Sequence, residues 1–188
     1  MIQEFFKGAI GPVAAGGFVG LLSLFNMGGR FFWSSVSDYI GRKPTYFVFF
    51  VLGATLYFLL PKTGADHLNS IALFVGIAVV LISMYGGGFA TIPAYLRDMF
   101  GTHHVSAIHG RLLTAWSTAG VLGPVLVNYL REYELAHGAD KSSAYQTVLH
   151  VMAGLLVVGF VANLLVRPVS EKYWMKDGSV VGADTGGH

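Results

Sequence analysis

The chain has 188 residues, of which 54% are hydrophobic and 12% are charged, and its mean hydropathy is +0.60. A soluble domain carries about twice that charged fraction and a disordered chain is far less hydrophobic, so both classes are excluded and a membrane protein is predicted. The absence of Cys excludes disulfides and thiolate metal sites, and a net charge of +2 gives no reason to expect nucleic acid as a partner.

Long uncharged stretches account for most of the chain. There are five of them, at residues 8–29, 44–61, 68–96, 112–130 and 142–166. About 20 apolar residues in a helix span the hydrocarbon core of a bilayer, and these stretches lack the alternation of a spanning strand. We therefore expect an all-α integral membrane protein with five transmembrane helices, at about residues 8–29, 44–61, 70–96, 108–130 and 143–166.

The basic residues predict an orientation. Four Lys and Arg lie on one side of the five spans and eight on the other, so the second side is expected to be cytoplasmic. This places the C-terminus inside and residues 1–7 outside, although these residues do not resemble a signal peptide. At least one helix is therefore expected before Met1. Residues 1–173 are interpreted as part of a larger bundle in the plasma (inner) membrane, and residues 174–188 as a flexible cytoplasmic tail.

Glycines recur within the predicted spans. Gly16 and Gly20 form a small-xxx-small pair, and Gly86, Gly87 and Gly88 stand together in the third span. Small residues let membrane helices approach closely, so these positions are interpreted as packing surface, with a kink or special site as the alternative for the glycine triplet.

Residues 29–44 are expected to form the loop between the first two spans. In this segment Asp38 comes three residues before Gly41, which is followed by Arg42 and Lys43. Gly41 permits a sharp turn, and Asp38 is placed to pair with a base or with a helix N-terminus. A generic basic cytoplasmic loop is the alternative interpretation.

This motif resembles the cytoplasmic-loop signature of the major facilitator superfamily, which recurs there between helices 2–3 and 8–9. The family pattern has Gly four residues before the acid, whereas this chain has Ser34. Residues 85–95, 100–102 and 108–116 are similar to the oxalate/formate antiporter family. The resemblance covers about residues 8–173 and implies that the five spans correspond to helices 8–12 of a twelve-helix carrier, whose N-terminal half is absent from this sequence.

Arg30 is the main candidate for a binding residue. On a continuous helix it lies eight residues, or about 12 Å, deeper than Asp38, near the middle of the hydrocarbon core. A charge there costs about 2.5 kcal/mol or more and needs a partner, yet no uncharged stretch supplies a carboxylate. The counter-charge is then an acid of the absent half or an anionic ligand, which the planar guanidinium binds through two hydrogen bonds. The alternative is that Arg30 snorkels to the interface.

The resemblance favours a ligand, because related carriers bind their substrate through an Arg at this place. Asn26, one turn earlier, either hydrogen-bonds a bound carboxylate or contacts another helix. The resemblance also implies that Tyr85, Phe89 and Trp116 wall the substrate, although their spacing is equally typical of core or lipid-facing aromatics.

Two departures from the relatives narrow the expected substrate and coupling. Proton-coupled relatives often have an acid where this chain has Asn26, so exchange or uniport is favoured over proton symport. Dicarboxylate carriers have a Lys one turn after the Trp, where this chain has Ala119. A small monocarboxylate, formate- or pyruvate-like, is therefore expected rather than oxalate.

The sequence contains no arrangement typical of an enzyme. It has no nucleophile–base pair, no phosphate-binding loop and no metal-ligand spacing, so no catalytic activity, cofactor or metal is expected. His103, His104 and His109 are interpreted as headgroup-facing or solvated side chains, since no third ligand has a suitable spacing. The expected function is secondary transport of a small carboxylate anion by alternating access. A truncated inactive remnant and a non-transporting membrane scaffold or sensor are the alternatives.

Overall fold

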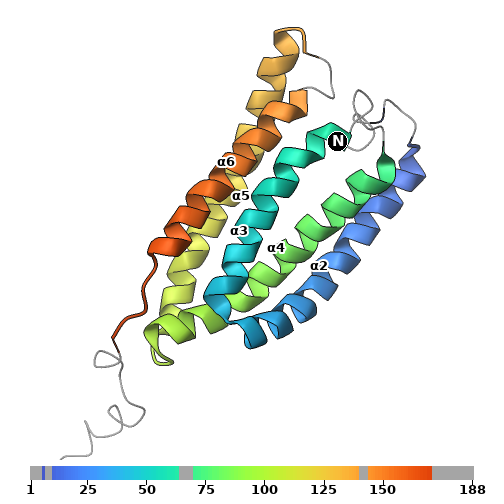
Figure 1. The fold of residues 1–188 in the computed structure, drawn as a ribbon. Helices are drawn as coiled ribbons and strands as arrows, with labels where there is room; N and C mark the ends of the chain where they lie inside the picture. The colour runs from blue at the N-terminus through green and yellow to red at the C-terminus, as the bar shows by residue number, and fades with distance from the viewer. Residues whose placement is uncertain (1–5, 7–9, 64–69, 140–143, 171–188) are drawn as a thin grey trace, which may run out of the picture.

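The computed structural model describes residue 6 and residues 10–63, 70–139 and 144–170. These ranges contain five long helices and one short 3₁₀ helix: α2 (Pro12–Ile40), α3 (Arg42–Leu59), η1 (Leu60–Thr63), α4 (Ile71–Phe100), α5 (Val105–Ala136) and α6 (Ala144–Leu165). The helices run alternately up and down in one elongated bundle (Figure 1). The all-α prediction is confirmed for the described residues, while the predicted tail at 174–188 lies outside them.

Four of the described helices are long and apolar enough to cross a membrane: α2, α3 with η1, α4 and α6. The fifth, α5, is the longest of the described helices but carries Ser, Thr, Asn and Gly along its predicted span, and none of its residues is buried. Such a helix suits a bundle position that faces other protein or an aqueous cavity rather than lipid on all sides.

The predicted loop at residues 29–44 is wrong for most of its length. Residues up to Ile40 continue α2, and Gly41 alone separates α2 from α3. Gly41 has a φ of 91°, a conformation that costs other residues a steric penalty, so the turn occurs where the chain has no Cβ. The basic residues that predicted a loop are instead held on helices, and Arg30 and Asp38 therefore share one continuous helix.

The α2–α3 and α4–α5 junctions lie at the same end of the bundle, together with the end of α6 (lower end of Figure 1). We call this the motif end, because it carries Asp38–Lys43, and we call the end that carries η1 the far end. A small buried cluster lies at the far end and consists of Phe6, Leu60, Phe74, Ile77 and Leu149. Elsewhere the helices expose large aliphatic and aromatic side chains, as expected when the surroundings are lipid or further protein.

Helices α2 and α4 cross at glycines. A Cβ atom added to Gly86 would lie 2.1 Å from the carbonyl oxygen of Asn26, and one added to Gly29 would lie 2.2 Å from that of Ser83. The two backbones therefore touch, which only Gly allows. Gly86 thus serves packing, as the sequence indicated, whereas a Cβ at Gly16 or Gly20 would meet nothing within 4 Å in the described structure.

Gly86→Ala should lower the stability of the bundle by about 1–3 kcal/mol, the usual cost of forcing extra atoms into a packed contact. Gly76→Ala is the matched control on the same helix, because its added Cβ has nothing within 4 Å. That variant should be neutral or slightly stabilising, since Ala favours helix over Gly. Thermal melting of both variants in detergent measures the difference, and equal melting temperatures would contradict the contact.

Candidate functional site

Arg30 lies on the part of α2 that faces α4. Its guanidinium carbon is 5.9 Å from the centroid of the Phe89 ring, which is a cation–π contact between the two helices. Among the described residues no carboxylate lies within ion-pair distance of Arg30, and the residue is exposed. The side chain is thus directed towards an aromatic ring of α4 and is not paired with Asp38.

The three aromatic residues predicted from the resemblance lie together. The Phe89 and Trp116 rings have centroids 5.9 Å apart, and the Trp116 indole Nε1 donates a hydrogen bond to the Tyr85 hydroxyl at 3.4 Å. Tyr85 and Phe89 come from α4 and Trp116 comes from α5. The contact between Arg30 and Phe89 therefore extends from α4 to α5. About half of the Tyr85 and Trp116 surface is exposed. We call Arg30, Tyr85, Phe89 and Trp116 the arginine–aromatic surface.

Asn26 lies one turn before Arg30 and is half-buried. Its backbone carbonyl rests against Gly86, so the close contact between α2 and α4 fixes its position. Its side-chain amide has no hydrogen bond within the described ranges. Its place beside Arg30, rather than any contact, makes it a candidate ligand.

Trp33 holds α2 against α3 and α4 one turn beyond Arg30. Its indole Nε1 donates to the Ser83 hydroxyl at 3.3 Å, and its ring packs edge-on against Phe49 with centroids 5.0 Å apart. A Cβ at Gly87 would lie 2.4 Å from that of Trp33, so this large side chain fits only because Gly87 has none. This packing fixes the position of Arg30 relative to Phe89 along the axis of the bundle.

Two apolar cavities adjoin the arginine–aromatic surface through Tyr85. One, of about 190 Å³, lies among α3, α4 and α6, and the other, of about 300 Å³, lies mainly between α2, α3 and α4 and is closed by one residue each of η1 and α6. Arg30 lines neither of them. Their walls are almost entirely hydrocarbon and aromatic, so neither offers a charged partner to a carboxylate, and the arginine–aromatic surface remains the better candidate for binding an anion.

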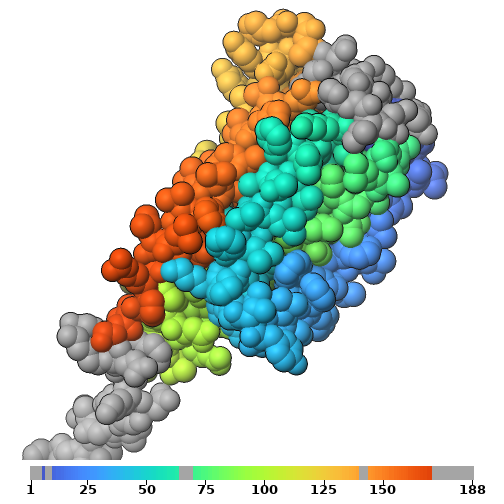
Figure 2. All heavy atoms as spheres, in the orientation of Figure 1, coloured from blue at the N-terminus to red at the C-terminus, as the bar shows by residue number. Residues whose placement is uncertain are grey.

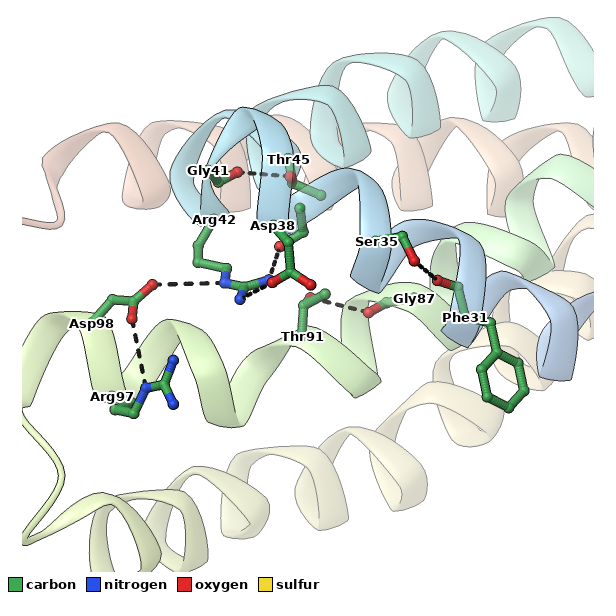
Figure 3. Close-up of polar contacts among 11 residues, drawn as sticks. Phe31, Ser35, Asp38, Gly41, Arg42, Thr45, Gly87, Thr91, Arg97 and Asp98 are labelled. Carbon is green, nitrogen blue, oxygen red and sulfur yellow. Dashed lines mark hydrogen bonds and ion pairs between the residues drawn. The ribbon is translucent and has the colours of Figure 1, made fainter.

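The predicted gate motif forms an ion-pair network at the motif end. Arg42 pairs with Asp38 on α2 and donates to the Ser37 hydroxyl, and its Nε lies 3.6 Å from the Asp98 carboxylate on α4. Figure 3 shows Arg42 between the two carboxylates, and it shows Arg97 in contact with the other carboxylate oxygen of Asp98. One guanidinium, 14% exposed, thus connects α2, α3 and α4.

Lys43 binds a different helix. Its ammonium donates to the carbonyl oxygens of Leu164 and Val166 at 3.2 and 2.9 Å, at the end of α6. Cations are favoured at helix C-termini, where backbone carbonyls lack partners. Gly41 makes the turn that directs the neighbouring side chains Arg42 and Lys43 to separate helices, which sequence reasoning did not assign.

A polar cluster between α3, α4 and α6 was missed by sequence reasoning. The Tyr46 hydroxyl donates to the Gly88 carbonyl at 2.6 Å, and the Tyr95 hydroxyl donates to the Asn163 side-chain oxygen at 3.0 Å. The two tyrosine rings stack with centroids 5.1 Å apart. Asn163 stands in an otherwise aliphatic run, and this isolated polar residue was the available signal for a buried contact.

The histidines near the α4–α5 junction do not form a recognisable metal centre. His103 and His104 make an edge-on ring contact with each other at 4.6 Å, and His109 points a buried Nδ1 away from any hydrogen-bond partner in the described ranges. No group of three potential metal ligands occurs among the residues that the structure describes.

Comparison with known proteins gives an independent assignment. The family model described as Major Facilitator Superfamily matches residues 2–178. The oxalate:formate antiporter of Oxalobacter formigenes is 35% identical over 105 residues, which make up 56% of this chain and 24% of that protein. The matched part therefore covers about a quarter of the length of this curated relative, and no solved structure matches. The chain belongs to the Major Facilitator Superfamily of multi-pass membrane transporters, and its resemblance to the oxalate/formate antiporter family is confirmed.

Proposed function

We propose that this chain supplies the anion-binding half of a carrier that exchanges small monocarboxylates by alternating access. The observation that carries the proposal is Arg30: its guanidinium lies on a membrane helix, against Phe89, with no carboxylate partner among the described residues. Such a charge is stabilised by an anion, and carriers of this kind keep their sites near the middle of the bilayer.

The arginine–aromatic surface suits a small carboxylate. The guanidinium offers two parallel N–H donors to the two carboxylate oxygens, and the Phe89 and Trp116 rings limit the space beside it. Asn26, one helical turn from Arg30, is placed to donate a further hydrogen bond. A single base in this half neutralises one carboxylate, so formate- or pyruvate-like anions are favoured over oxalate.

Exchange is the proposed mode of transport. An unoccupied Arg30 is a net charge that must cross a low-dielectric barrier when the carrier reorients, whereas the Arg30–carboxylate pair is neutral. Asn26 cannot titrate, so it offers no proton to couple to the movement. The ion-pair network at the motif end then serves as the gate that opens and closes with each cycle.

The rest of the cavity is proposed to come from the other seven helices of a twelve-helix carrier, in the same gene product or in a separate chain. The open arginine–aromatic surface and the unburied α5 support this, because both would otherwise leave polar groups against lipid. An inactive remnant and a non-transporting sensor are the competing candidates.

Counterflow in liposomes tests the proposal. The chain is reconstituted alone and together with the N-terminal seven helices of a related carrier. The vesicles are loaded with unlabelled formate, and uptake of labelled formate, pyruvate and oxalate is followed. We expect the combined assembly to take up labelled formate, and to do so only when the vesicles contain formate. Anion binding without uptake would favour the sensor, and neither binding nor uptake would favour the remnant.

Ala119→Lys should shift the substrate preference of the active assembly towards oxalate. The added ammonium supplies a second positive charge on α5, three residues after Trp116, where a dicarboxylate has its second carboxylate to neutralise. Competition of unlabelled oxalate against labelled formate measures the change, and we expect oxalate to compete about tenfold better, the equivalent of one charge-assisted hydrogen bond. Ala119→Gln is the uncharged control, and an equal shift in that variant would contradict the charge argument.

We further propose that the motif end faces the cytoplasm. Because the chain has no Cys, single cysteines report topology without background. Thr102→Cys lies at the motif end and His137→Cys at the far end, and both positions are exposed. A membrane-impermeant maleimide should label His137→Cys in intact cells and Thr102→Cys only after permeabilisation, and the reverse pattern would invert the topology.

A further inference from the structure

An open groove lies between α3 and α6, away from the arginine–aromatic surface. Its volume is about 560 Å³, and it is lined by Ala54, Thr55, Phe58, His150, Ala153, Gly154 and Val157. The two helices lie side by side on one face of the molecule (Figure 1 and Figure 2). A Cβ at Gly154 would meet nothing within 4 Å, so the groove is open at that point rather than filled by packing.

The surface around this groove is apolar, as expected for a surface in contact with lipid. Helix α6 has no charged residue, and its exposed side chains include Leu155, Val158, Val161 and Leu165. Within the groove, the Thr55 hydroxyl donates to the Val51 carbonyl of its own helix at 2.8 Å and so presents no free donor. The lining therefore suits a hydrocarbon chain along most of its length.

His150 is the exception in this lining. It is exposed on α6, its ring lies 5.1 Å from the Phe58 ring, and it makes no hydrogen bond with the described residues. An imidazole without a hydrogen-bond partner next to hydrocarbon is costly, so the group that fills the groove is expected to carry a polar part at this end.

Lys62 contacts the same aromatic ring. Its ammonium lies 5.1 Å from the Phe58 centroid, and no acid among the described residues pairs with it. Phe58 is one residue from the end of α3, so Lys62 and His150 lie near the far end of the bundle, where the candidate membrane span Arg42–Thr63 ends. A span of this length brings its end to the expected level of the headgroups. Two nitrogen donors therefore stand at the headgroup end of an apolar groove.

We propose that this groove is a binding site for an anionic phospholipid, with an acyl chain between α3 and α6 and the phosphate between Lys62 and His150. Charge complementarity selects an anionic lipid over a zwitterionic one, because Lys62 brings a positive charge that no described acid neutralises. The acyl chain covers the floor at Ala153 and Gly154, and the phosphate accepts the hydrogen bond that His150 otherwise lacks.

Native mass spectrometry of the full chain in detergent tests the site, with phosphatidylglycerol and phosphatidylcholine of equal chain length as probes. The wild-type chain should retain one phosphatidylglycerol in preference to phosphatidylcholine. Lys62→Gln should bind phosphatidylglycerol about fivefold more weakly, which corresponds to about 1 kcal/mol for one basic side chain at an anionic surface. Arg111→Gln, which removes an exposed base from α5, should bind as the wild type does.

Filling the groove tests the acyl-chain part separately. Gly154→Leu places a side chain in open space, so it should fold normally and lose the retained lipid, whereas Gly76→Leu, also in open space on α4, should keep it. Equal retention of both lipids by the wild type, or unchanged retention in Gly154→Leu, would overturn the proposal. A dimer that Gly154→Leu disrupts would overturn it too, and displacement of the lipid by inorganic phosphate alone would show an anion site without an acyl chain.

Discussion

Replacing Arg30 by Ala should reduce formate counterflow by about 100-fold, because the substitution removes a two-point, charge-assisted contact worth roughly 3 kcal/mol. Nothing else on the arginine–aromatic surface carries a positive charge: Phe89 and Trp116 offer rings, and Tyr85 offers a hydroxyl already engaged by the Trp116 indole. The substrate would lose the counter-charge that we propose for it on this surface.

Arg30→Lys separates charge from geometry. An ammonium keeps the positive charge but cannot donate two parallel hydrogen bonds to one carboxylate, so we expect an intermediate loss of about tenfold. Arg30 is exposed and makes no ion pair with the described residues, so both variants should keep the wild-type melting temperature. Arg111→Gln controls for a general effect of removing a base. Undiminished counterflow in both Arg30 variants would remove this residue from the mechanism.

The sequence predicts the helices of this bundle well because their signal is local. Runs without charge are set by the thickness of the bilayer, and each run can be recognised without knowing its neighbours. The same reasoning fails for residues 29–40, because it interprets charge as the sign of a loop. Basic residues near a membrane surface report which side a segment faces, not whether it is helical, and here α2 continues to Ile40.

Contacts between helices are harder to predict from the sequence than the helices themselves. Asp98 was not selected as a partner of Arg42, because the two residues are far apart in the sequence and meet only through the packing of α3 on α4. Among the glycines of the described ranges, only Gly29 and Gly86, at the crossing of α2 and α4, lie against the backbone of another helix. The sequence does not reveal the height at which two helices cross. The grouping of Arg30, Phe89 and Trp116 came from the family resemblance, since helical spacing alone relates only residues of one helix.

The second large effect is expected from replacing Arg42 at the motif end. Arg42→Gln removes the ion pair with Asp38, the hydrogen bond to Ser37 and the contact with Asp98. The ends of α2, α3 and α4 therefore lose the side chain that connects them. We expect the melting temperature in detergent to fall by an amount equivalent to about 1–2 kcal/mol. The loss is limited because the Asp38 and Asp98 side chains are 63% and 49% exposed, so water partly replaces the lost partner.

The same substitution should lower the maximal counterflow rate about tenfold, and the concentration for half-maximal rate should change with it, because the population of each gate conformation sets the apparent affinity. The network lies about 12 Å of helix away from Arg30, so it bears on the gating equilibrium and not on the bound anion. Arg97→Gln is the matched control, because its guanidinium is 58% exposed and Asp98, at 3.8 Å, is its only ion-pair partner among the described residues. Both readouts should therefore stay near wild type. A double-mutant cycle of Arg42→Gln with Asp98→Asn isolates the contact between α3 and α4. Strictly additive losses would mean that this pair does not couple the two helices, and the gate would then rest on Asp38 and Lys43.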